Sequence, residues 1–96
     1  MVEDFARVHI WVTGRVQGVG FRAFVATSAG FIGVTGWVRN SGYETVEAVA
    51  EGTQLQIEQF TRMIKTGPSV SRVEASRIEE ETPTGEFADF IIRSSR

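Results

Sequence analysis

A glycine-rich stretch followed by an arginine is the part of the 96-residue sequence best suited to hold an anion. Segment 14–20 reads GRVQGVG, between an alternating apolar run and a predicted helix, and Arg22 lies in the first helical turn. A helix N-terminus presents unpaired backbone N–H groups and a positive dipole end, and glycines let an anion approach without meeting a Cβ atom. The pattern indicates a phosphate site, with a plain tight turn as the alternative.

Arg22 stands against the local electrostatic preference, because the helix dipole disfavours a cation in the first turn. A bound anion would explain it, and so would pairing with an acidic side chain or exposure to solvent; spacing alone leaves these open. The P-loop pattern is absent, since no Gly-Lys-Ser/Thr occurs. Residues 18–23 fit a dinucleotide-binding pattern, but Arg39 and Asn40 stand where a Rossmann domain needs an acidic residue, so we reject that match.

The elements that must position these residues follow from the spacing of apolar side chains. In chain order we predict a strand at 7–13, a helix from Phe21 to near Gly33, and strands at 34–40 and 45–51 joined by a hairpin at 41–44. A second helix should begin at a capping box formed by Thr53 and Gln56 and end at Gly67, with the apolar stripe Leu55, Ile57, Phe60, Met63 and Ile64. A bulged strand at 71–79, a solvated polar turn at 79–85 and a short strand at 87–93 should follow.

This order of elements predicts an α+β fold. Two helices are too few to cover both faces of a sheet, so both should lie on one face. We therefore expect a ferredoxin-like two-layer α/β sandwich (βαββαβ) with a mostly antiparallel sheet and an added terminal strand, forming a single domain over residues 1–96.

The composition excludes several classes of site. The sequence has no cysteine and one histidine, so we expect no disulfide, no thiol nucleophile and no metal site. A net charge of −2 argues against broad binding of nucleic acid. Acidic residues Glu3 and Asp4 stand where a secretory signal carries basic ones, and no apolar run is long enough to span a membrane. We expect a cytoplasmic monomer with no membrane or nucleic-acid partner.

Two segments resemble the signature of the acylphosphatase family. Residues 12–22 read VTGRVQGVGFR and residues 36–40 read GWVRN, matching both halves of the family pattern without a gap, and weaker likeness continues to residue 93. The resemblance implies a ferredoxin-like fold and metal-free, cofactor-free hydrolysis of acyl phosphates to a carboxylate and inorganic phosphate. Two segments depart from the family pattern: Gly42-Tyr43-Glu44 replaces a common Asp-Gly hairpin, and the sequence ends in Ser94-Ser95-Arg96.

The resemblance also assigns roles to residues. It implies that Arg22 binds the phosphate and that Asn40 positions the attacking water; without it, Asn40 before Ser-Gly would be read as a turn residue. The expected phosphate-binding set, which combines loop N–H groups with the guanidinium, is Arg15, Val16, Gln17, Gly18, Val19, Gly20 and Arg22. The leaving carboxylate needs no proton, so a general acid is dispensable and His9 is expected to be an outer-face strand residue.

Two alternatives use the same fold. Trp11 and Trp37, predicted on the outer sheet face, resemble the aromatic platform of an RRM, so an RRM-like module binding nucleic acid or a small anion is the rival function. The sequence also resembles the acylphosphatase-like domain that opens larger carbamoyl-transferring maturation proteins. That likeness adds carbamoyl phosphate to the expected substrates.

Overall fold

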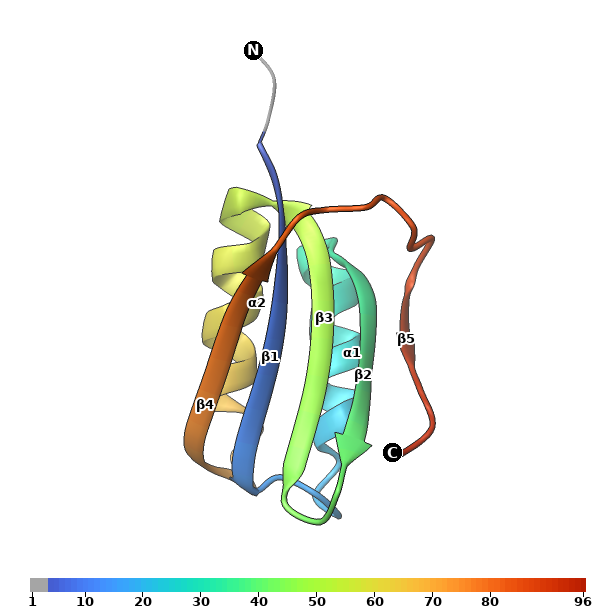
Figure 1. Cartoon of the computed structure of the whole chain (residues 1–96). Coiled ribbons are helices and arrows are strands. Elements are labelled where there is room, and N and C mark those ends of the chain that lie inside the picture. Colours follow the sequence, from blue (N-terminus) through green and yellow to red (C-terminus); the bar gives the residue numbers. More distant parts are fainter. Residues whose placement is uncertain (1–3) are drawn as a thin grey trace.

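Two helices cover one face of a five-stranded sheet in the computed structural model, which describes residues 4–96 (Figure 1). The elements are β1 (Phe5–Arg15), α1 (Phe21–Ile32), β2 (Thr35–Ser41), β3 (Thr45–Thr53), α2 (Gln54–Thr66), β4 (Arg72–Glu81) and β5 (Phe90–Ile92). The strand order is β4-β1-β3-β2-β5, and every pair is antiparallel except β2 with β5. The ferredoxin-like prediction is confirmed. No helix among the described residues is long and apolar enough to cross a membrane.

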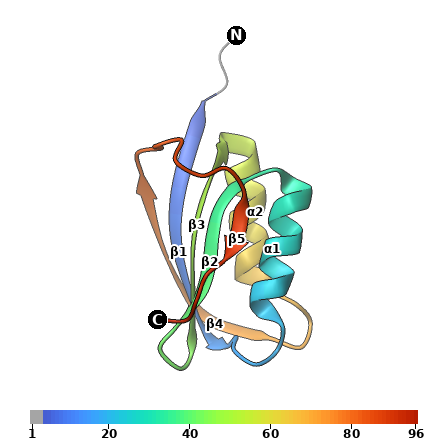
Figure 2. The same ribbon diagram turned by 90° about the vertical axis from the view of Figure 1, so that its right-hand side faces the viewer.

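The core lies between the sheet and the helices, the two layers that Figure 2 shows edge-on. Alternate residues of β1 point toward the helices and are buried, and each helix buries one stripe: Val8, Ile10 and Val12 from β1, Phe21, Val25 and Ala29 from α1, and Ile57, Phe60 and Ile64 from α2. The predicted capping box at Thr53 and Gln56 is present. Leu55, predicted in the α2 stripe, is exposed, because two residues before Ile57 is about 200° around the helix.

Strand β4 is longer than predicted. Its expected bulge is present, as a shift of register against β1 between Thr13 and Gly14. The polar turn predicted at 79–85 is wrong at its start, because Glu80 and Glu81 follow Glu79 in the strand, opposite residues 7–9 of β1. Pairing with a neighbouring strand outweighs the low strand propensity of glutamate there.

The last strand is shorter than predicted. Only Phe90–Ile92 form β5, paired with three residues of β2, whereas 87–93 were expected. The segment before β5 bonds to the end of the sheet instead, since the backbone N–H groups of Thr84 and Gly85 donate to the Glu51 carboxylate at 3.0 Å each. The Phe87 ring lies under the Arg7 guanidinium. After β5, Arg93 N–H donates to Val38 O and Arg96 N–H to Asn40 O, so the chain still follows β2.

The sheet face away from the helices carries an ion-pair network around two buried carboxylates, Glu47 and Glu51. Glu47 accepts from His9 Nε2 at 2.7 Å and from Arg39 Nε at 2.8 Å. Burial alone would raise the pKa of Glu47, but the bonds from Arg39 and His9 outweigh it and lower that pKa. The pKa of Glu51 is also lowered, because bonds from Thr84, Arg7 and Gly85 outweigh burial. His9 is thus an outer-face strand residue, as predicted.

We expect this network to make stability depend on acid pH. A carboxyl group whose pKa is lower in the folded state than in the unfolded state stabilises the protein at pH values above its ordinary pKa of 4.5. That contribution is lost as the pH falls through the pKa of the folded state. Glu51→Gln should lower the free energy of unfolding at neutral pH by about 2 kcal/mol and flatten its fall in acid, because charge-assisted hydrogen bonds are lost. Urea unfolding across pH measures both. Glu58→Gln, on the exposed side of α2, is the control; equal effects of the two changes would contradict the assignment.

Candidate active site

The loop between β1 and α1 takes the conformation that its glycines allow. Gly18 and Gly20 have φ of 73° and 74°, and Gly20 is the left-handed N-cap of α1. A Cβ at either position would meet no atom within 4 Å, so these glycines are required by backbone conformation and not by crowding. The predicted reason for the glycines, a backbone with its N–H groups open on one side, fits this geometry.

The N-terminus of α1 has no side-chain cap. Its first hydrogen bond runs from Phe24 N–H to Gly20 O, and no acidic residue lies in its first turn. Within residues 4–96, no protein acceptor takes a hydrogen bond from the backbone N–H groups of residues 16–20. Unpaired N–H groups at the positive end of a helix dipole form a site for an anion.

Asn40 comes to the same end of the molecule from β2. The 16–20 loop and the β2–β3 hairpin lie next to each other there (Figures 1 and 2). Asn40 lies two residues after Val38, whose side chain is in the core, so both side chains point to the helix side of the sheet. The asparagine therefore faces the start of α1 and not the ion-pair network on the other face.

Arg22 and Asn40, the two predicted catalytic residues, line the same hollow of about 230 Å³. Its lining consists of Val16, Gly18, Gly20, Phe21, Arg22, Ala23, Asn40 and Ile92. Arg22 is half-buried, and within the described part of the chain it forms no ion pair. The lining contains this one cation and no carboxylate, so the hollow favours a negatively charged group.

The remaining predicted loop residues are arranged differently. Arg15 is exposed at the end of β1, and Val19 is partly buried against the core. Gln17 turns its side chain toward the hairpin, where Nε2 donates to Gly42 O at 3.0 Å and to Thr45 O at 2.9 Å. Neither Arg15 nor Val19 lines the hollow. A phosphate-binding part for Arg15, Gln17 and Val19 therefore stays a prediction.

Ile92 is a lining residue that the sequence reasoning missed. Parallel pairing of β5 with β2 brings Ile92 opposite Val38, two residues before Asn40. The only signal in the sequence was the weak family likeness of the segment that ends at residue 93. A strand pairing between residues so far apart along the chain leaves no local pattern.

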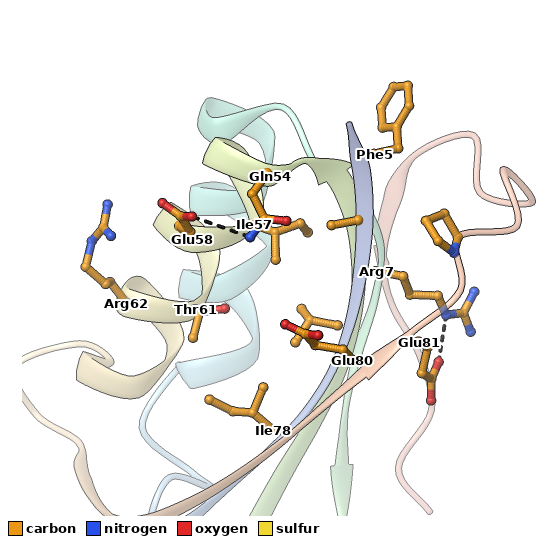
Figure 3. A pocket seen from close by; sticks show the side chains of 13 residues that line it. Phe5, Arg7, Gln54, Ile57, Glu58, Thr61, Arg62, Ile78, Glu80 and Glu81 are labelled. Atoms are coloured by element: carbon orange, nitrogen blue, oxygen red, sulfur yellow. Dashed lines mark hydrogen bonds and ion pairs between the residues drawn. The ribbon is translucent and has the colours of Figure 1, made fainter. Parts of the chain in front are cut away.

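A second hollow, of about 480 Å³, lies between α2 and the β1–β4 edge (Figure 3). Apolar side chains such as Ile57 and Ile78 line it, and the figure shows Gln54 paired with Glu58 and Arg7 with Glu81. Arg62 is its other cation, and the carboxylates of Glu58, Glu80 and Glu81 also line it. Because the carboxylates in this lining outnumber the arginines, the hollow does not favour an anion and does not match the predicted chemistry.

The outer-face tryptophans do not form an open platform. Trp37 is 8% exposed, with the Arg39 and Arg93 guanidinium carbons 4.7 and 4.8 Å from its ring centroid. Trp11 stacks on His9 at 3.9 Å, and Arg77 lies over it at 5.0 Å. Bases stack on free aromatic faces in RRM-type recognition. The RRM-like reading is therefore not favoured by this face.

Comparison with known proteins gives one consistent result. The family model described as Acylphosphatase matches residues 8–92. The acylphosphatase of Roseiflexus sp. (strain RS-1) is 46% identical over 89 residues, covering 93% of this chain and 96% of the relative.

Two solved structures extend the comparison. The crystal structure of acylphosphatase from Bacillus subtilis superposes with a TM-score of 0.87 at 35% identity, covering 92% of this chain and 98% of that one. The crystal structure of full-length HypF in the phosphate- and nucleotide-bound form superposes with a TM-score of 0.86 at 34% identity, over 99% of this chain and 13% of HypF.

Proposed function

The chain belongs to the acylphosphatase family, and we propose that it hydrolyses acyl phosphates in the hollow between the 15–20 loop and Asn40. The observation that carries this proposal is that Arg22, Asn40 and residues of the glycine loop line one hollow without a carboxylate, and that the backbone N–H groups of residues 16–20 have no acceptor within residues 4–96. The small acyl phosphate is the substrate, with water as the second reactant.

The phosphate cradle, which consists of the loop backbone and the Arg22 side chain, holds the phosphoryl group. Backbone N–H groups of residues 15–20 and the Arg22 guanidinium donate to its oxygens, and each charge-assisted bond contributes roughly 1.5–3 kcal/mol. The planar guanidinium can grip two phosphate oxygens, which a lysine cannot. The backbone N–H groups are held by the fold before substrate binds, so they stabilise charge on the equatorial oxygens with little reorganisation.

Asn40 aims the water. Its side-chain carbonyl accepts a hydrogen bond from water and its NH₂ group donates to a phosphate oxygen, so the water is held in line with the departing carboxylate. The P–O bond to the acyl group breaks as the water oxygen bonds to phosphorus, and the proton of water passes to the phosphate product. The carboxylate leaves as a stable anion, so no histidine, metal ion or cofactor is needed to protonate or activate it.

We expect acetyl phosphate and benzoyl phosphate to be hydrolysed at rates that excess EDTA does not change. Inorganic phosphate should inhibit competitively, because it occupies the same cradle as the substrate. A coupled assay for released phosphate and carboxylate measures both. Loss of turnover in EDTA, or quenching of tryptophan fluorescence by RNA without any turnover, would contradict the proposal.

Three finer features accompany the proposal. We propose that the enzyme is monomeric, which sedimentation tests. We also propose a cytoplasmic location, testable by cell fractionation. Carbamoyl phosphate is included among the proposed substrates, since the cradle grips the phosphate and leaves the acyl side loosely specified.

A further inference from the structure

The side chain of Gln17 joins the phosphate loop to the hairpin that follows Asn40. Its Nε2 donates to Gly42 O at 3.0 Å and to Thr45 O at 2.9 Å, at the two ends of the turn between β2 and β3. A carboxamide NH₂ group has two hydrogens, and both are used on backbone carbonyls. One side chain of the loop therefore holds both ends of the turn.

The hairpin transmits this restraint to Asn40. Across the β2–β3 ladder, Ser41 pairs with Thr45 and Asn40 with Val46, so the asparagine is one pair further along the same ladder from the carbonyl that Gln17 holds. Gln17 itself lies between Val16 and Gly18, which both line the hollow. A shift of the hairpin relative to the loop would thus change the separation between Asn40 and the cradle.

We propose that Gln17 is a positioning residue that sets the place of Asn40 relative to the phosphate cradle through its bonds to the hairpin. The inference rests on the proposed function, because it assigns Gln17 to the step in which Asn40 aims the water. The Gln17 side chain acts on the hairpin, and its backbone N–H stays part of the cradle. Loss of its amide displaces the water from the line of attack, and displacements of about 1 Å lower rates by up to about a hundredfold.

Other contacts keep the loop and hairpin together without Gln17. Gly14 N–H donates to Glu44 O at 3.0 Å, and the Thr13 and Thr45 hydroxyls are 3.3 Å apart. The β1–β3 ladder also runs to Thr13 and Thr45. A variant that lacks the amide therefore keeps the fold and loses the fine alignment.

The test is a double-mutant cycle on turnover of benzoyl phosphate. Gln17→Met has similar length and no donor, and we expect it to lower kcat about tenfold while the inhibition constant of inorganic phosphate changes less than about twofold. In the Asn40→Ala background the same change should lower kcat less than about twofold, because no amide remains to be positioned. Gln17→Leu, which is also neutral, repeats the cycle if the methionine variant does not fold. Gln54→Met, which removes an exposed amide on α2, is the matched control and should leave kcat unchanged.

Three results would overturn the inference about Gln17. An equal loss of kcat in both backgrounds overturns the inference, as does a loss of phosphate affinity as large as the loss of kcat. A lower melting temperature with unchanged kcat in the folded variant overturns it as well. The proposed function fails in a different way, through an inactive wild type or an Asn40→Ala variant with normal turnover.

Discussion

Arg22→Ala is expected to lower kcat/KM for acetyl phosphate about a thousandfold, the largest effect of any single change at this site. The guanidinium is the one charged group lining the hollow, and it forms no ion pair within residues 4–96 that would keep it from a substrate. Losing two charge-assisted bonds to a phosphate costs roughly 3–6 kcal/mol, and about 1.4 kcal/mol corresponds to a factor of ten. Substrate binding and kcat should both decline, because the bonds exist before and during bond cleavage.

Two further variants separate charge from geometry at this position. Arg22→Lys keeps the positive charge but cannot grip two oxygens, so its kcat/KM should lie between those of wild type and Arg22→Ala. Arg62→Ala removes an exposed arginine of α2, away from the hollow, and should leave kcat/KM unchanged. Steady-state kinetics with acetyl phosphate measures all three. If Arg22→Ala retains near-normal turnover, Arg22 is a surface cation and the phosphate must bind elsewhere.

Local patterns in the sequence were sufficient for most of the fold. The 3.6-residue spacing of Phe21, Val25 and Ala29 predicted α1, and Thr53 with Gln56 predicted the start of α2, because helix periodicity and capping are properties of neighbouring residues. The ends of β4 and β5 were wrong because other strands determine them. Glu81 belongs to β4 through its pairing with Arg7 in β1, which residues 79–81 alone do not reveal.

The candidate site shows the same division between local and long-range information. The loop and Arg22 are contiguous in sequence, so helix electrostatics alone raised the possibility of a phosphate site. Asn40 required the family resemblance, since by itself it resembles a turn residue. The Gln17 contact with Gly42 and Thr45 had no signal in either pattern, because it depends on where the β2–β3 hairpin lies relative to the loop.

Asn40→Ala is expected to lower kcat about a hundredfold while the inhibition constant of inorganic phosphate stays within about threefold of wild type. Arg22 and the loop N–H groups remain, so the cradle still binds the phosphate group. What is lost is the amide that orients water toward phosphorus, and that loss affects the transition state more than the bound substrate. This split between rate and affinity is the opposite of the joint loss expected for Arg22→Ala, so the pair of variants distinguishes a group that aims water from a group that binds phosphate.

Asn40→Asp tests whether the amide donor, and not only the shape of the side chain, is what Asn40 contributes. The carboxylate has the shape of the amide, but it repels the phosphate dianion and has no N–H to donate, so both kcat and phosphate affinity should fall. Gln54→Ala removes an amide on α2, away from the hollow, and serves as the control. Since the Asn40 backbone pairs with Val46 and accepts from Arg96 N–H, neither change at Asn40 removes a backbone bond of the hairpin. If Asn40→Ala instead weakens phosphate binding as much as it slows turnover, the asparagine belongs to the cradle and another group must aim the water.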